Sequence, residues 1–328
     1  MALIKEKIDL TIGIPLYNAS NLIERCIDSI LSQKTQYTFE IIIVDDGSTD
    51  DSLTYIKKYD DKRIHLYKQE NAGPSKARNK TIKEAKGKYF AFLDADDYWL
   101  PNYIEETISF LESHTQCIAV SVAQKHFTVS GIQYSPTYIF EKDAQKEPFV
   151  IEDFYNFWSK YFHVCTGSIV IKTDIVKSIG GQREELRICE DLEFWGVLAT
   201  YGKFGLIPKI LFISDGLQTI KNNGWLEKNI KRWNSAPTIE EWEKRIIKRF
   251  GDNIPQSYIK ARGIIAQNLS YSMILSKRYN LARKEILKYG NDFPIGRMKN
   301  LLTLSAKNSI IWYITTRLLV YREYNRKL

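Results

Sequence analysis

The feature that most constrains the fold is the repeated alternation of strand-like and amphipathic helical segments in the N-terminal part of the chain. Short strand-like runs, mostly apolar, occupy residues 8–14, 39–45, 63–67 and 89–93, and apolar residues recur at helical spacing between them. Strands that alternate with helices in this way pair in parallel, because each helix returns the chain to the start of the next strand. The sequence therefore predicts an α/β fold in which helices cover both faces of a mostly parallel sheet.

Polar residues follow three of the predicted strands at the point where each strand ends. The first strand runs into Pro15-Leu-Tyr-Asn18, the second into Asp45 and Asp46, and the fourth into Asp94-Ala-Asp-Asp97. Ligands of parallel sheets bind beyond the carboxyl ends of the strands, which lie along one edge. The sequence therefore predicts one site in which acidic and aromatic residues from separate strands meet.

The three carboxylates between Asp94 and Asp97 favour a divalent cation. Carboxylates this close repel one another, and burying them costs several kcal/mol unless a cation compensates. Mg²⁺ is typically held by one or two carboxylates and the phosphates of a substrate, and Mn²⁺ accepts the same oxygen ligands. The alternative is that Asp96 or Asp97 caps the helix that begins near Pro101.

Glycine-rich phosphate loops are missing from the sequence. No G-x-G-x-x-G follows the first predicted strand, and no Walker sequence occurs. A nucleotide at this edge would therefore be held by a metal, an Arg side chain and backbone groups. This pattern excludes ordinary dehydrogenases and P-loop enzymes.

Composition is that of a soluble globular protein in a reducing compartment. Hydrophobic residues make up 44% and charged residues 26% of the 328 residues. The four cysteines show no metal-ligand spacing, which is typical of free thiols. A strand-like segment follows the charged N-terminus directly and leaves no room for a signal peptide. We therefore expect a cytoplasmic location.

Positive charge is concentrated in the C-terminal third. Residues 221–328 contain 22 Lys and Arg against 8 Asp and Glu, whereas residues 1–220 carry a net charge of about −6. The basic part shows amphipathic helical periodicity at 239–250, 256–275 and 279–289. We predict a catalytic domain over residues 1–220 and a basic, all-helical extension over residues 221–328.

A basic surface fits a phosphorylated substrate, an anionic lipid headgroup or nucleic acid. No nucleic-acid-binding module is recognisable, so we expect no nucleic-acid partner. The last segment, 301–320, combines Leu, Ile, Trp312 and Tyr313 with basic residues. It is suited to the inner surface of a membrane and equally to a core or homodimer helix.

Four motifs, in order along residues 15–97, together resemble a known family. They are Pro15-x-Tyr17-Asn18, Glu40-x-x-x-Val44-Asp45-Asp46-Gly47-Ser48-x-Asp50, Asn71-x-Gly73 with Ala77-Arg78-Asn79, and Asp94-x-Asp96-Asp97. Their order and spacing resemble the inverting glycosyltransferases of family 2, which have the GT-A fold. The resemblance extends over roughly residues 8–215.

This resemblance implies a binding site for a nucleoside diphosphate sugar. Its residues would be Pro15, Tyr17, Asn18, Asp46, Gly73, Arg78, Asp94, Ala95 and Asp96. Asp46 would accept a hydrogen bond from uracil or a similar base. Arg78 would donate two parallel hydrogen bonds to a phosphate or a carboxylate. Asp94 would reach the ribose or the metal, and Asp96 would ligate the Mn²⁺ or Mg²⁺ that bridges the diphosphate. The structural alternatives are a rim aromatic for Tyr17, a turn former for Asp46 and a solvated helix residue for Arg78.

The pair Glu190-Asp191 precedes an amphipathic segment and is similar to the Glu-Asp motif of the same family. A sugar hydroxyl is a poor nucleophile near neutral pH and needs a base within hydrogen-bond reach of its proton. The resemblance assigns that role to Asp191, with Glu190 and Trp195 on the acceptor side. The alternative is that both acids only cap the helix.

Three further segments bear on architecture and mechanism. Residues 118–140 predict a hairpin at the edge of the sheet. Residues 215–224, which include two glycines, predict a flexible loop able to close over the nucleotide. Asn229-Ile-Lys-Arg-Trp233 is similar to the Gln-x-x-Arg-Trp motif of processive polysaccharide synthases, but its first residue differs and no eighteen consecutive residues are apolar. We therefore expect single sugar additions.

The sequence thus predicts a metal-dependent inverting glycosyltransferase that moves one sugar from a UDP-sugar, or another nucleoside diphosphate sugar, to a hydroxyl of a glycan or lipid-diphosphate-linked acceptor. The basic extension would hold it at the inner face of the cell membrane, in the assembly of cell-surface polysaccharides such as capsule or O-antigen. Two alternatives remain. A nucleotidyltransferase shares the metal and the sheet but should have a glycine-rich, basic first loop, and the other alternative is a non-catalytic sugar-binding or scaffold protein.

Overall fold

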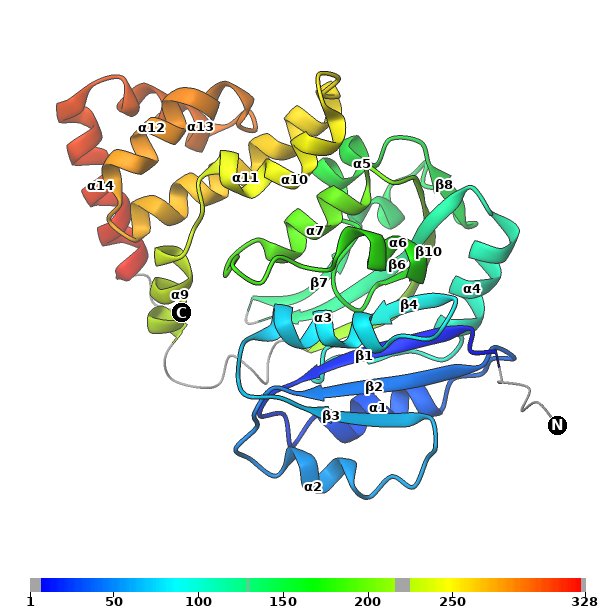
Figure 1. The fold of residues 1–328 in the computed structure, drawn as a ribbon. Helices are drawn as coiled ribbons and strands as arrows, with labels where there is room; N and C mark the ends of the chain where they lie inside the picture. The colour runs from blue at the N-terminus through cyan, green and yellow to red at the C-terminus, as the bar shows by residue number, and fades with distance from the viewer. Residues whose placement is uncertain (1–6, 129, 216–224, 326–328) are drawn as a thin grey trace.

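The structure is a computed structural model that describes residues 7–128, 130–215 and 225–325. Ten strands of the described residues form one mixed sheet in the order β3-β2-β1-β4-β9-β6-β10-β5, with β7 paired to β6 and β8 paired to β10 (Figure 1). The strands are β1 (Leu10–Leu16), β2 (Phe39–Asp45), β3 (Ile64–Lys68), β4 (Tyr89–Phe92), β5 (Tyr98–Trp99), β6 (Cys117–Thr128), β7 (Gly131–Ser135), β8 (Phe149–Ile151), β9 (Ile169–Lys172) and β10 (Lys203–Asp215).

The predicted parallel alternation is confirmed in the first half of the sheet. Strands β3, β2, β1 and β4 pair in parallel, and β10 pairs in parallel with β6. Strand β9 runs antiparallel to both β4 and β6, so β6 and β10 point in the same direction as the first four strands. The carboxyl ends of β1, β2 and β4 therefore share one edge, which places the polar residues that follow them side by side.

Helices cover both faces of this sheet. The helices within the sheet region are α1 (Ile23–Leu31), α2 (Ser52–Ile56), α3 (Pro74–Glu84), α4 (Tyr103–Ser113), α5 (Phe154–Tyr161), α6 (Thr173–Ile179) and α7 (Glu190–Leu198), with a 3₁₀ turn η1 (Thr137–Phe140). Side chains alternate along β4: Tyr89 and Ala91 join the core under α1 and α4, and Phe90 and Phe92 join the core under α6 and α7. This two-sided burial is the one predicted for the apolar run that begins at Tyr89.

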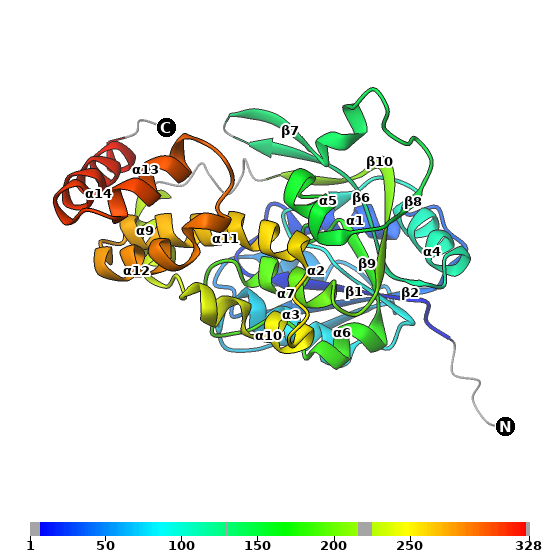
Figure 2. The ribbon, with the colours of Figure 1, turned by 90° about the horizontal axis from the view of Figure 1, so that it is seen from above.

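The C-terminal region is helical, as the periodicity predicts. Its elements are α9 (Trp225–Asn234), α10 (Ile239–Phe250), α11 (Gln256–Leu275), α12 (Tyr279–Tyr289), η2 (Gly290–Asp292), α13 (Arg297–Ala306) and α14 (Ser309–Tyr324). Figures 1 and 2 show α12, α13 and α14 grouped at one end of the molecule, away from the sheet.

The helices α10 and α11 share a hydrophobic core with the sheet region. One continuous cluster includes Trp195 of α7, Trp242 and Ile246 of α10, and Leu269 of α11. Helices α7 and α10 approach so closely that a Cβ added at Gly196 would lie 2.6 Å from Ile246 Cδ1. The predicted boundary between residues 220 and 221 lies outside the described residues, and the packing shows no break between the two regions around α10.

The hairpin predicted for residues 118–140 is present, and among the described residues its second strand, β7, pairs with β6 alone and lies at an edge of the sheet. The prediction is wrong for its first strand, which lies mostly in the interior. Only Gln124–Thr128 of β6 pairs with β7, whereas the first part of β6 lies between β9 and β10 in the interior of the sheet. The long strand pairs twice because later segments, far along the chain, return to both of its sides. Of the loop predicted at 215–224, only Asp215 belongs to the described residues.

His163 is a buried, uncharged residue of the core. Its side chain is fully buried between the rings of Phe154 and Phe157, 5.1 and 5.0 Å away between centroids. Neither ring nitrogen has a hydrogen-bond partner among the described residues. Burial disfavours the imidazolium and lowers the pKa of His163 from 6.5 to about 3.

We predict that His163→Leu flattens the acid dependence of stability. Between pH 6.5 and 3 the unfolded chain binds a proton at His163 and the folded chain does not, so this contribution to stability is present above pH 6.5 and is lost as the pH falls. The free energy of unfolding of the wild type should therefore drop by about 2 kcal/mol more than that of the variant between pH 7 and pH 5. Urea unfolding at both pH values measures this difference, and parallel acid dependence would contradict the prediction.

Candidate functional site

A cleft of about 530 Å³ lies at the carboxyl edge of the sheet, beyond β1, β2 and β4. It is lined by Pro15, Leu16, Tyr17, Asn18, Ala19, Leu22, Asp46, Asn71, Gly73, Pro74, Ala77, Arg78, Asp94, Ala95 and Asp96. All nine residues predicted for the nucleotide-sugar site are in this lining. The fold thus brings together residues that are separated by up to eighty positions in the sequence.

Two loops of the cleft are joined by the side chain of Asn18. Its Oδ1 accepts a hydrogen bond from the Thr49 backbone N–H at 2.8 Å, and its own N–H donates to Ser48 Oγ at 3.1 Å. Asn18 adopts a left-handed conformation with φ of 50°, which Asn tolerates better than most residues. The chain turns sharply here and leaves Tyr17 53% exposed at the mouth of the cleft. An aromatic ring so placed can stack on a nucleotide base.

Asp46 fixes the loop that precedes α3. Its two carboxylate oxygens accept hydrogen bonds from the backbone N–H groups of Ala72 at 2.9 Å and Gly73 at 2.8 Å, and Oδ1 also accepts one from Gln69 Nε2 at 2.7 Å. The side chain is buried. Asp46 therefore fixes the shape of the cleft floor. The turn-forming alternative considered for Asp46 in the sequence analysis is the one nearest to this structural role.

Arg78 connects the acidic groups of the site. Its Nη2 donates to both oxygens of Asp94, at 2.8 and 3.0 Å, and its Nη1 lies 3.4 Å from Gln182 Oε1. Burial opposes the charge of the guanidinium, but Asp94 and, more weakly, Asp191 and Glu190 outweigh it, and the pKa of Arg78 is raised. The solvated-helix alternative for Arg78 is wrong, since the side chain is buried.

Negative charge accumulates where β4 ends. Burial, together with the charges of Asp94 and Asp96, raises the pKa of Asp97 to about 8. Asp97 Oδ1 accepts a hydrogen bond from the Asp215 N–H at 3.0 Å. Hard carboxylate oxygens that destabilise one another suit a divalent cation. The described residues contain no group of three or more His, Cys, Asp or Glu arranged to hold a metal by themselves.

Arg25 is a site residue that the sequence analysis missed. Its Nη1 forms an ion pair with Asp215 Oδ2 at 2.7 Å, its Nη2 donates to the Asp96 carbonyl at 2.7 Å, and its guanidinium lies 4.5 Å from the centroid of the Tyr98 ring. Arg25 thereby ties the end of β10 to the acidic turn. No spacing rule links a residue of α1 to one almost two hundred positions later, so the sequence carried no signal for this contact.

The motif Glu190-Asp191 forms the first turn of α7. Asp191 Oδ1 accepts a hydrogen bond from the Leu192 N–H at 2.8 Å, so the capping alternative describes part of its role. Burial, and then the charge of Asp191, raises the pKa of Glu190, while Arg78 and Arg232 oppose that rise. Glu190 Oε2 is buried without a hydrogen-bond partner among the described residues. Because Arg78 lines the cleft and interacts with both acids, the motif lies on the same side of the molecule as Asp94.

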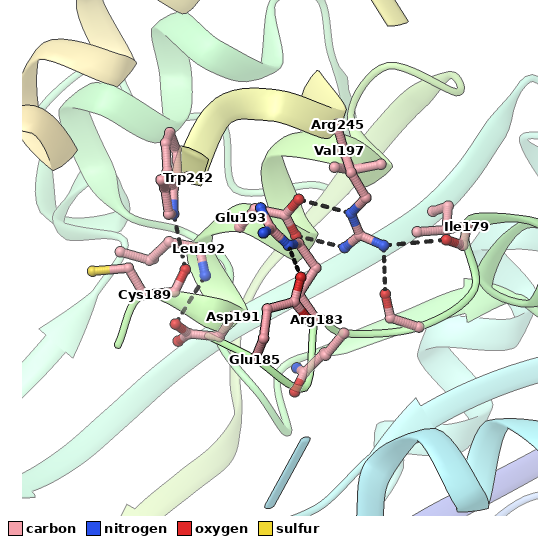
Figure 3. Close-up of polar contacts among 12 residues, drawn as sticks. Ile179, Arg183, Glu185, Cys189, Asp191, Leu192, Glu193, Val197, Trp242 and Arg245 are labelled. Carbon is pink, nitrogen blue, oxygen red and sulfur yellow. Dashed lines mark hydrogen bonds and ion pairs between the residues drawn. The ribbon is translucent and has the colours of Figure 1, made fainter. Parts of the chain in front are cut away.

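Helix α10 holds this motif in place (Figure 3). Trp242 Nε1 donates to the Cys189 carbonyl at 3.0 Å, directly before the motif. Arg245 forms two bonds with the fully buried Glu193, at 2.7 and 2.5 Å, and Nη1 of Arg245 donates to the carbonyls of Ile179 and Gly181. The segment that leads into α7 is thus fixed at both ends by one helix of the C-terminal region.

Among the predicted site residues, Trp195 alone is buried without lining the cleft. Its side chain is fully buried and packs against Phe194, with ring centroids 5.0 Å apart. Position 195 lies on the inner face of α7, whereas Glu190 is only partly covered. The Trp195 side chain therefore stabilises the core and is not accessible to an acceptor.

The cleft lies at the carboxyl edge of an α/β sheet, where such sheets bind their ligands, and Arg78 links its acidic turn to the pair Glu190-Asp191. The family model described as glycosyl transferase family 2 matches residues 11–180. The chain therefore belongs to glycosyl transferase family 2.

Relatives and solved structures agree with this family. The chain is 35% identical over 173 residues to the Escherichia coli enzyme WfaP, named a UDP-Glc:α-D-GlcNAc-diphosphoundecaprenol β-1,3-glucosyltransferase, with 52% of this chain and 63% of WfaP covered. It is 34% identical over 193 residues to the uncharacterized glycosyltransferase RP339 of Rickettsia prowazekii, covering 57% of each. The matched part is thus less than two thirds of either relative.

Two solved structures show the same GT-A type of fold. TarS residues 1–349 of S. aureus, in complex with UDP-GlcNAc, superimposes with a TM-score of 0.66 at 16% identity, covering 97% of this chain and 92% of that one. The mannosyltransferase PcManGT of Pyrobaculum calidifontis, in complex with GDP-Man and Mn²⁺, gives a TM-score of 0.55 at 17% identity, with coverages of 97% and 88%. At sequence identities this low, the similarity to these structures shows the fold alone.

We predict that Arg245→Met destabilises the protein by about 3–5 kcal/mol, because it leaves the carboxylate of Glu193 buried without its partner. The double variant Arg245→Met/Glu193→Leu removes both charges and should recover most of that loss. Urea unfolding of the two variants and the wild type measures the difference. Equal destabilisation of the single and the double variant would show that the ion pair does not carry the effect.

Proposed function

We propose that the protein is a metal-dependent inverting glycosyltransferase that moves one sugar from a UDP-sugar to a hydroxyl of a glycan or lipid-diphosphate-linked acceptor, in the synthesis of a cell-surface polysaccharide. The observation that supports it most is the position of Arg78. Its side chain pairs with Asp94 in the cleft and interacts electrostatically with Asp191 and Glu190. Donor and acceptor groups can therefore meet at one place.

The donor would lie along the cleft with its base at the outer end. Tyr17 offers an exposed ring for stacking, and Pro15 and Gly73 form the adjoining walls. Among the described residues, Asp46 Oδ2 accepts one hydrogen bond, from the Gly73 N–H, which leaves a lone pair for a base N–H. The diphosphate would then reach the acidic turn at Asp94 and Asp96.

The residues present fit a divalent cation that binds together with the donor. Asp96 and Asp94 would hold Mn²⁺ or Mg²⁺, with diphosphate oxygens completing the coordination, because Asp94 is already shared with Arg78 and no described cluster of three ligands exists. When bound, such an ion stabilises the negative charge that develops on the leaving diphosphate.

The acceptor hydroxyl would be activated by Asp191. The carboxylate takes the hydroxyl proton while the acceptor oxygen forms a bond to the anomeric carbon from the face opposite the diphosphate. The bond from the anomeric carbon to the diphosphate oxygen breaks, and that oxygen keeps the electron pair. Attack from the opposite face inverts the anomeric centre. Glu190 would accept a hydrogen bond from a second acceptor hydroxyl, which is supported by its Oε2, an oxygen without a hydrogen-bond partner among the described residues.

The choice of UDP is supported by the names of similar proteins. WfaP is named for a UDP-Glc donor and TarS is seen with UDP-GlcNAc, whereas PcManGT is seen with GDP-Man. A lipid-diphosphate acceptor is likewise supported by the name of WfaP. Family membership and the Pro15–Asn18 loop, which is not glycine-rich, argue against a nucleotidyltransferase.

A location at the inner face of the membrane is supported by the surface of α13 and α14. Among the described helices, none combines the length and apolar character needed to span a bilayer. The exposed large apolar side chains of this region are Ile295, Leu301, Leu304, Ile310, Ile311, Tyr313, Ile314, Leu318 and Tyr321. They lie among basic residues such as Lys307 and Arg317, a combination that favours anionic lipid.

We predict that Asp191→Asn lowers sugar transfer by about 10³-fold, because the amide cannot take the hydroxyl proton. Its stabilisation by UDP with Mn²⁺, measured by thermal shift, should match that of the wild type, whereas Asp96→Asn should lose the Mn²⁺-dependent part. UDP release from a panel of UDP-sugars measures turnover. Full activity of Asp191→Asn would overturn the assignment of the base, and stabilisation by GDP but not UDP would overturn the donor.

We predict that the protein floats with vesicles that contain phosphatidylglycerol and not with vesicles of phosphatidylcholine alone. Ile314→Glu/Leu318→Glu should abolish flotation by placing charge in the apolar face, while Phe140→Glu, which changes an exposed aromatic on η1, should not. Absence of flotation by the wild type, with a dimer in sedimentation that the double substitution dissociates, would assign this face to a homodimer instead.

A further inference from the structure

A second cavity, of about 600 Å³, adjoins the cleft and has a strongly basic lining. The described residues that line it are Asn71, Ala72, Gly73, Arg187, Lys231, Arg232 and Ser235. They come from the loop before α3, the segment that leads to α7, and helix α9 with Ser235 directly after it. All charged residues among them are cations. Asn71 and Gly73 line the cleft as well, so the two spaces are separated by a single loop.

The three cations of this basic cavity contrast with the other arginines of the same region. Arg183 pairs with Glu185 and Glu241, and Arg245 pairs with Glu193. Among the described residues, no acid pairs with Arg187, Lys231 or Arg232. Arg187 only approaches the Ala72 carbonyl, with Nη1 3.4 Å away. Like charges that converge without an ion-pair partner among the described residues favour an anionic ligand.

The basic cavity lies beside the proposed catalytic pair. Arg232 lowers the pKa values of both Glu190 and Cys189, although burial and the neighbouring acids raise those pKa values overall. Arg187 is three residues before Glu190, on the segment that α10 fixes. An anion bound between these cations would therefore sit next to the first turn of α7, where the acceptor hydroxyl must reach Asp191.

We propose that Arg187, Lys231 and Arg232 bind the diphosphate group of the acceptor. This inference rests on the proposed function and identifies the part of the acceptor that the enzyme recognises. The donor diphosphate belongs to the other end of the cleft, at Asp94 and Asp96, whereas the basic cavity meets the cleft at Asn71 and Gly73. Arginine and lysine form charge-assisted hydrogen bonds with phosphate oxygens, and two guanidinium groups suit a diphosphate with its two adjacent charges.

Calorimetric titration of the full chain with geranyl diphosphate tests the proposal. UDP is kept saturating so that the cleft is filled, and EDTA is present so that no metal bridges the two ligands. We expect one geranyl diphosphate per chain, and at least tenfold weaker binding to Lys231→Gln/Arg232→Gln. The control Lys142→Gln/Lys146→Gln removes the same charge from an exposed loop outside both cavities and should bind as the wild type does.

Two further ligands identify what is recognised. Inorganic pyrophosphate should bind to the wild type and lose affinity in the Lys231→Gln/Arg232→Gln variant, which shows recognition of the diphosphate itself, and geraniol should not bind. Tighter binding of geranyl diphosphate than of pyrophosphate supports a lipid-linked source, and equal binding supports a diphosphate without a lipid contact.

Three results would overturn the inference. They are no binding of either diphosphate, equal binding by the wild type and the Lys231→Gln/Arg232→Gln variant, or a tenfold loss of UDP affinity in that variant with geranyl diphosphate binding unchanged. The last result would assign the cations to the donor. Failure of the wild type to bind UDP would instead count against the proposed function, so the two hypotheses are separated by the first step of the experiment.

Discussion

The buried guanidinium of Arg78 is the charge on which the candidate site depends. It pairs with Asp94 at the end of β4 and offsets the charges of Asp191 and Glu190 at the start of α7. Without a central cation, these carboxylates would repel one another across the cleft, and the two motifs would not share one space. Arg78 reaches this position from the second turn of α3.

The other contacts of the site join loops of the protein to one another and fix their conformation. Asn18 and Asp46 join the loops after β1, β2 and β3, and Arg25 ties the acidic turn to the end of β10. Helix α10 does the same for the segment before α7 through Trp242 and Arg245. These contacts lower the conformational freedom of the cleft before a ligand binds. Binding then costs less conformational entropy, because the loops are already ordered.

Much of the fold could be predicted from the sequence because it depends on local periodicity, and the residues of the cleft could be predicted because four motifs resemble those of a known family. The run that begins at Tyr89 is apolar on every residue, as a strand buried on two faces requires, and the acids follow where it ends. Contacts between distant elements could not be predicted. Arg25 meets Asp215 only because β10 returns to the sheet beside β5, and Trp195 turns inward only because α10 packs on α7. A pattern of residue types within α7 does not specify which helix covers it.

The close approach of α7 and α10 at Gly196 limits how α7 can be exchanged between related chains. The match to the family model ends at residue 180, so α7 and α10 both lie outside the matched segment. A chimaera that exchanges α7 alone would lose the contact of Gly196 with Ile246 and the ion pair of Glu193 with Arg245. An exchange that keeps both contacts must therefore move α7 and α10 together.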